Sequence, residues 1–158
     1  MAIPIINLSI LNGDNGFQLN EGEDGHLGIS VSNAGDINGD GFDDVIANAE
    51  FKKYVVFGKA SGFDAMFDLS TLNGNNGFRI DSKTIGRSVS NAGDVNGDGF
   101  DDVIISAFES SYVIFGKASG FDSAISLSNL DGTNGFRLNG ISGSVSTAGD
   151  VNGDSLDD

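Results

Sequence analysis

Three copies of an acidic nine-residue loop contain the residues of this chain best suited to chemistry. They read DINGDGFDD from Asp36, DVNGDGFDD from Asp94 and DVNGDSLDD from Asp150. Oxygen-bearing side chains stand at loop positions 1, 3, 5 and 9. Glycine at position 6 of the first two copies lets the backbone turn sharply, which leaves the position 7 carbonyl free to point inward. Because Ca²⁺ takes about six to eight oxygen ligands in proteins, the pattern predicts calcium-binding loops.

The acidic residues of the chain are concentrated in these loops. Each loop holds four aspartates, and together they make twelve of the 23 acidic residues in a chain of net charge −15. Carboxylates this close repel one another unless a cation neutralises them. The acidity also argues against nucleic acid as a partner, because nucleic acid selects basic surfaces. No apolar run is long enough for membrane insertion.

The sequence offers no catalytic constellation. It has no cysteine and one histidine, His26, which excludes a Cys-His pair and makes a Ser-His-Asp triad implausible. We expect His26 at the surface. Paired acids such as Asp43 and Asp44 belong to a repeated loop, which favours a structural role over acid–base catalysis. We therefore expect a protein without enzymatic activity.

The acidic loops belong to a longer repeat. They begin at residues 36, 94 and 150, which are 58 and 56 residues apart, and Asn-Gly-Phe recurs in step with them at 15–17, 76–78 and 134–136. The repeat divides the chain into units of approximately 8–68 and 69–126, followed by a truncated unit at 127–158.

Short β-branched and aromatic runs predict the strands of each unit. They lie at 45–47, 54–57, 103–105 and 112–115, and several are apolar throughout, as in strands covered on both faces. No segment has helical periodicity, so we expect little helix. About four short antiparallel strands in a repeat of this length indicate an all-β fold of β-propeller blades.

Two other calcium modules fit the loops poorly. An EF-hand needs a glutamate at loop position 12 and flanking helices, whereas position 12 is Ala47 in the first loop and Ile105 in the second. A dockerin opens with a similar acidic run but needs helices at a much shorter period.

The chain resembles the FG-GAP repeat family, which forms the propeller of integrin α subunits and occurs in bacterial surface and secreted proteins. The matching segments are SNAGDINGDGFDDVI at 32–46 with VVFG at 55–58, and SNAGDVNGDGFDDVI at 90–104 with VIFG at 113–116. The resemblance implies a seven-bladed propeller in the parent fold, with Ca²⁺ in the loop that joins the first two strands of a blade.

The resemblance also implies a ligand set for each loop. The first loop would use the side chains of Asp36, Asn38, Asp40 and Asp44 and the carbonyl of Phe42. The second would use Asp94, Asn96, Asp98 and Asp102 with the carbonyl of Phe100. The third would use Asp150, Asn152, Asp154 and Asp158 with the carbonyl of Leu156.

The third loop departs from the family pattern. Ser155 replaces the glycine of position 6, and the sequence stops at Asp158, so no second strand anchors the last ligand. We therefore expect two calcium ions, with weak or absent binding in the third loop. The position 8 residues Asp43, Asp101 and Asp157 are expected to point away from the ion.

The expected function is adhesion or ligand recognition at the cell surface or outside the cell, with another protein or a surface glycan as the partner. About two and a half blades leave an incomplete ring with exposed sheet edges, which favour homo-oligomerisation. Two alternatives stay open: an accessory propeller of a larger secreted hydrolase, and an assembly fragment that oligomerises to complete a propeller.

Overall fold

Two β-sheets packed face to face make up most of the protein. The computed structural model describes residues 7–22 and 26–158. Within these ranges every regular element is a strand, apart from three short 3₁₀ turns, η1 (Leu8–Ile10), η2 (Leu69–Thr71) and η3 (Leu127–Asn129). No helix in this part of the chain is long and apolar enough to cross a bilayer. The predictions of an all-β fold and of little helix are confirmed.

The first sheet is an antiparallel blade with one added strand. Its spatial order is β2–β3–β4–β6, with the later strand β10 beside β6. The strands are β2 (Ser30–Gly35), β3 (Asp44–Asn48), β4 (Lys52–Val56), β6 (Gly77–Asp81) and β10 (Ala124–Ser126). The apolar runs predicted at 45–47 and 54–57 form most of β3 and β4.

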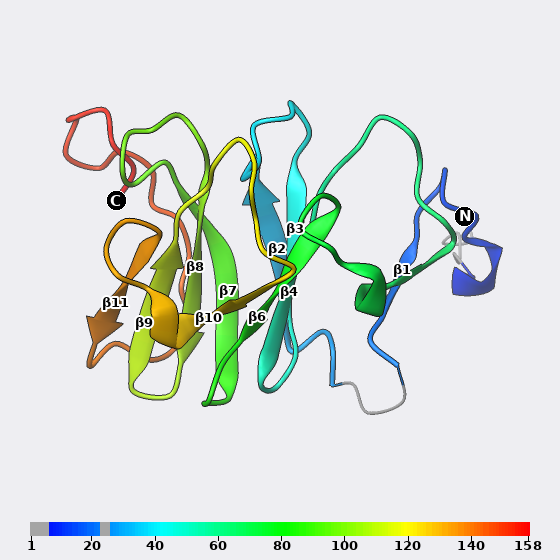
Figure 1. Cartoon of the computed structure of the whole chain (residues 1–158), viewed down its shortest axis with the longest axis horizontal. Coiled ribbons are helices and arrows are strands. Elements are labelled where there is room, and N and C mark those ends of the chain that lie inside the picture. Colours follow the sequence, from blue (N-terminus) through cyan, green and yellow to red (C-terminus); the bar gives the residue numbers. More distant parts are fainter. Residues whose placement is uncertain (1–6, 23–25) are drawn as a thin grey trace, which may run out of the picture.

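The second sheet repeats the four antiparallel strands of the first. Its order is β7–β8–β9–β11, and Figure 1 shows it stacked beside the first sheet along the long axis of the molecule. The strands are β7 (Gly86–Gly93), β8 (Asp102–Ala107), β9 (Ser110–Ile114) and β11 (Gly135–Asn139). Two stacked four-stranded sheets with one topology are successive propeller blades. Two blades and the remaining segments do not close a ring, as expected.

Parallel strand pairs link each sheet to its neighbours, which sequence reasoning did not predict. β10 pairs with β6 in the parallel direction, and β1 (Gln18–Asn20) pairs in the same way with β5 (Met66–Asp68). β1 occupies the same position in the repeat as β6, because both follow an Asn-Gly-Phe motif. Each short connecting strand therefore lies along the outer strand of the preceding unit.

The main core lies between the two sheets. It includes Ile46, Val55, Phe78 and Ile80 from the first sheet and Val103, Ile105 and Ile114 from the second, all almost fully buried. A smaller core containing Ala49, Tyr54, Val56, Leu69 and Leu72 covers the opposite face of the first sheet. Neighbouring residues on a strand point to opposite faces, so the two cores explain why β4 is apolar at successive positions.

One charged residue is enclosed with these apolar side chains. Lys53 on β4 is fully buried, and its Nζ has no hydrogen-bond partner among the described residues. Burial lowers the pKa of Lys53 to about 8, because removal from water disfavours the ammonium form.

Candidate metal centre

The three acidic loops lie along one edge of the molecule. Loop 1 (36–44) joins β2 to β3 and loop 2 (94–102) joins β7 to β8, while loop 3 (150–158) follows the segment after β11. All three loops lie at the upper edge of the view in Figure 1, beside the ends of their sheets. Loops 1 and 2 therefore each connect the first two strands of a blade, which is where the sequence predicted the candidate ligands.

The aspartate at position 1 organises each loop. The Asp36 carboxylate accepts hydrogen bonds from the backbone N–H groups of Asp40 and Gly41, both at 2.9 Å. In loop 2 the Asp94 carboxylate accepts from Asp98 at 3.1 Å and from Gly99 at 2.8 Å. These local bonds fold a short acidic segment into a turn, since aspartate readily caps nearby N–H groups.

The residue at position 6 has a left-handed backbone in all three loops. Gly41 has φ 88°, Gly99 has φ 90° and Ser155 has φ 72°. The prediction that this position needs positive φ is confirmed. Glycine adopts this conformation without a steric penalty, whereas a residue with a Cβ pays roughly 1–2 kcal/mol for it. Loop 3 therefore has the same turn with a less suitable residue.

The position 9 carboxylates of loops 1 and 2 are buried at the base of the loops. Asp44 is 1% exposed, and its two oxygens accept from the N–H groups of Ile37 at 3.0 Å and Gly58 at 2.7 Å. Asp102 is 0% exposed and accepts from Val95 at 3.1 Å and Gly116 at 2.8 Å. Each carboxylate thus ties its loop to the segment that follows the third strand of the blade.

Burial sets the protonation of these two carboxyl groups. It raises the pKa of Asp44 and of Asp102 to about 7, against the lowering effect of their backbone hydrogen bonds. The other aspartates of each loop add to the rise, because their negative charges disfavour a further carboxylate.

The position 8 aspartates connect one loop to the next. Asp101 of loop 2 accepts a hydrogen bond from the Asp36 N–H of loop 1 at 2.8 Å, and Asp157 of loop 3 accepts from the Asp94 N–H at 2.9 Å. The position 8 residue of loop 1, Asp43, accepts instead from the Asn33 side chain at 3.3 Å. Sequence reasoning missed this role, although an aspartate at position 8 of every copy was a signal for it.

Close approach of neighbouring loops requires a glycine before position 1. A Cβ on Gly35 would lie 2.2 Å from a carboxylate oxygen of Asp101, and a Cβ on Gly93 would lie 2.1 Å from one of Asp157. The Ala-Gly-Asp motif that precedes each loop therefore leaves room for the carboxylate of the following loop.

The loop carboxylates have no basic side chain to neutralise them. In the described part of the chain the ion pairs join Arg79 to Asp81 and His26 to Glu50, and neither involves a loop residue. His26 is exposed, as predicted. Within the same ranges, no three Asp, Glu, His or Cys side chains converge as a ready-made metal cluster.

The donor chemistry of the loops nevertheless fits a hard cation. Every candidate ligand is an oxygen of aspartate, asparagine or the backbone. A carboxylate offers about four lone-pair directions, and Asp44 uses two of them on backbone N–H groups. The remaining lone pairs are available to an ion, so Asp36, Asn38, Asp40, Asp44 and the Phe42 carbonyl fit the expected ligand set.

Comparison with known proteins gives the repeats a family. Residues 27–61 and 85–115 match the family model described as FG-GAP repeat. The chain is 33% identical over 88 residues to integrin alpha-4 of Xenopus laevis, covering 52% of this chain and 8% of that protein. It is 32% identical over 103 residues to integrin alpha-2 of Mus musculus, covering 59% of this chain and 9% of that protein.

The chain thus spans less than a tenth of the length of these two relatives. Both matched segments contain a complete acidic loop and the strands on either side of it. The resemblance drawn from the sequence motifs is confirmed: residues 27–61 and 85–115 are FG-GAP repeats of the integrin alpha type, folded as two neighbouring propeller blades.

Proposed function

We propose that this chain is a calcium-stabilised propeller module for adhesion or ligand recognition, working at the cell surface or outside the cell. The observation that carries the proposal is the pair of complete acidic loops. Each presents an all-oxygen donor set between two strands of a blade, and no basic side chain of the described residues pairs with its carboxylates.

Calcium supplies positive charge to these loops when bound. Asp36 and Asp40 stand on the turn itself, while Asp44 is the first residue of β3 and is fixed by Gly58 beyond β4. Holding all three on one ion would tie the turn to the blade, so binding free energy would become folding free energy. Calcium is millimolar outside cells, and a ligand at 100 times its Kd adds about 2.7 kcal/mol of stability.

The recognition role rests on the similarity to integrin alpha chains. Because the chain covers a small part of those proteins, adhesion and the nature of the partner are inferences for this chain. The partner we infer is another protein or a surface glycan, and the module itself is non-enzymatic. Two stacked blades present one row of loops on one edge, which suits a binding surface supported by rigid sheets.

Calcium titration by calorimetry, with thermal melts in calcium and in chelator, tests this proposal. We expect two ions per chain and a melting temperature about 5–10 °C higher with saturating calcium. Asp40→Ala and Asp98→Ala should each remove one ion, whereas Asp154→Ala in loop 3 should leave the stoichiometry unchanged. Equal melting temperatures with calcium and chelator would refute the calcium role, and three ions would refute our interpretation of loop 3.

A further inference from the structure

The repeat places the same tyrosine–arginine pair at two successive positions. Tyr54 on β4 lies opposite Arg79 on β6, and Tyr112 on β9 lies opposite Arg137 on β11. The members of each pair are 58 residues apart in the sequence. The two pairs therefore occupy equivalent places in the two blades, and their surroundings are compared directly below.

The first pair is satisfied by carboxylates of this chain. The Tyr54 hydroxyl donates to Oε1 of Glu21 at 2.8 Å. The Arg79 guanidinium donates to the two carboxylate oxygens of Asp81 at 2.7 and 3.0 Å. Glu21 follows β1 directly, so the end of the preceding unit's outer strand delivers its carboxylate to this place.

The second pair lacks both carboxylates. Ser82 stands at the repeat position of Glu21, and Asn139 stands at that of Asp81. Arg137 donates instead to the Ser110 hydroxyl at 3.0 and 2.7 Å and lies 5.8 Å from the centre of the Tyr112 ring. No aspartate or glutamate of the described ranges forms an ion pair with Arg137.

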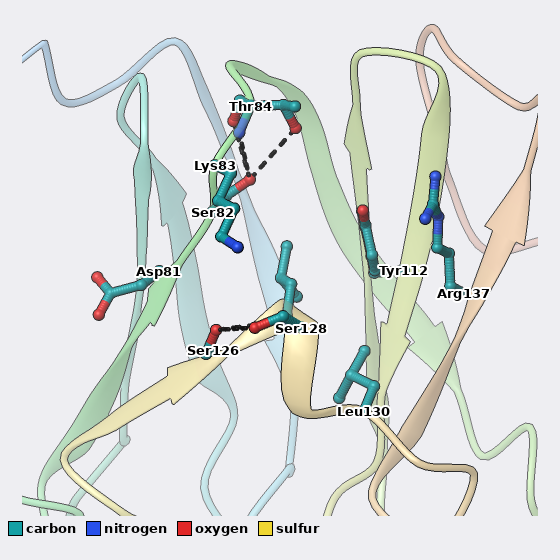
Figure 2. A pocket seen from close by; sticks show the side chains of 10 residues that line it. Asp81, Ser82, Lys83, Thr84, Tyr112, Ser126, Ser128, Leu130 and Arg137 are labelled. Carbon is teal, nitrogen blue, oxygen red and sulfur yellow. Dashed lines mark hydrogen bonds between the residues drawn. The ribbon is translucent and has the colours of Figure 1, made fainter.

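A groove of about 380 Å³ lies at the second pair, where the first has Glu21. It runs between the outer strands of the two blades and is lined in part by Ser82, Lys83, Tyr112, Ser126, Ser128 and Arg137. Figure 2 shows Tyr112 and Arg137 side by side on neighbouring strands, with Lys83 across from them and the Asp81 carboxylate turned away. Among the residues drawn there, Tyr112 makes no hydrogen bond.

The chemistry of this groove is opposite to that of the chain as a whole. The chain has a net charge of −15 and eight basic residues, yet two of those eight line this groove without a carboxylate partner among the described residues. Arginine binds carboxylates through two parallel hydrogen bonds, and a tyrosine hydroxyl donates one more. The groove therefore offers donors and positive charge to an incoming acid.

We propose that this groove binds an acidic peptide segment of a partner protein through a glutamate side chain. The partner's carboxylate takes the place that Glu21 takes beside Tyr54, accepting from the Tyr112 hydroxyl and from Arg137, with Lys83 adding positive charge. A peptide glutamate is the ligand that the chain itself supplies at the equivalent place, which favours a peptide over an acidic sugar. The proposal does not depend on calcium, because none of these residues belongs to an acidic loop.

An NMR titration with two matched tripeptides tests the proposal. The probes are N-acetyl-Gly-Glu-Gly-amide and its glutamine counterpart, added to the full chain with calcium held constant. We expect the glutamate peptide to shift the signals of Tyr112, Ser110 and the Arg137 side chain, and the glutamine peptide to bind about ten-fold more weakly. Arg137→Gln should weaken the glutamate peptide by a similar factor, and Arg79→Gln should leave it unchanged.

A second variant separates loss of binding from loss of folding. Ser82→Glu restores the acid of the first pair, so it should fill the groove from within, keep the protein folded and abolish peptide binding. Equal binding of the two tripeptides, undiminished binding to the Ser82→Glu protein, or no binding of either tripeptide would each overturn the proposal. Galacturonate binding in the groove without the glutamate peptide would also overturn it, in favour of an acidic sugar. None of these outcomes would bear on calcium binding.

Discussion

Loops 2 and 3 share their local hydrogen bonds but differ in how they end. Asp94 accepts from the N–H groups of Gly97, Asp98 and Gly99, and Asp150 accepts from the three equivalent residues of loop 3. At position 9, Asp102 is buried and bound to Gly116, whereas Asp158 is exposed and its second oxygen accepts from the Asn152 side chain at 3.3 Å.

The comparison separates what nine residues do alone from what a blade adds. The turn depends on bonds between residues two to five positions apart, so it forms wherever the motif occurs. Burial of the last carboxylate needs a third strand and the glycine that follows it, as Asp102 shows. We infer that a loop becomes a strong calcium site only when its blade is built around position 9.

Removing the buried carboxylate of loop 2 should have the largest effect. Asp102→Ala leaves the buried N–H groups of Val95 and Gly116 without their acceptor, so we expect a loss of about 3 kcal/mol in the free energy of unfolding. Asp158→Ala is the matched control and should cost less than about 0.5 kcal/mol, because the residue is exposed. Urea denaturation in chelator measures both, and similar losses would contradict the comparison.

The bond between loops should have a smaller effect. Asp101→Ala removes the acceptor of the Asp36 N–H, and we expect a loss of about 1 kcal/mol together with faster hydrogen exchange at that amide. Asp43→Ala changes the same loop position, but its partner is the Asn33 side chain at an exposed site. The two variants should therefore differ in stability, and an unchanged Asp36 exchange rate in Asp101→Ala would exclude the proposed link.

The smallest effect should follow from easing the turn of loop 3. Ser155→Gly removes a Cβ from a residue at φ 72°, so the turn should gain up to about 1 kcal/mol of local stability. Gly99→Ser is the converse change in loop 2 and should lose a similar amount. Amide exchange of residues 150–158 reports the gain; equal protection in the original and Ser155→Gly proteins would show that position 6 does not limit loop 3.

The fold was predictable because its signals are local and repeated. Runs such as Tyr54–Phe57 are too short for buried helices and carry the residues that favour strands, and three copies of one motif fixed the repeat. The positive φ at position 6 followed from glycine in two copies. The parallel pairs β1–β5 and β6–β10 were missed, because a three-residue connecting strand has no periodicity of its own.

The candidate site was predictable only as far as one loop at a time. Asp36, Asn38 and Asp40 were found from their spacing, since they act within a single turn. The contact of Asp101 with the Asp36 N–H spans 65 residues, and sequence spacing carries no information about which blades are adjacent. The groove at Arg137 was missed for the same reason. The replacement of Glu21 by Ser82 has meaning only once the two tyrosines are known to be equivalent.

The exchange of outer strands has a consequence for how such proteins grow and how they are divided. Each sheet draws its last antiparallel strand from the following sequence unit, so a fragment ending at Asp68 would lose β6 and with it Phe78 and Ile80. Viable fragments should be cut in the connection at 82–85, between the two sheets. A tandem gene duplication has no such restriction, because a new copy inserted at any phase inherits a neighbour that supplies the missing strand.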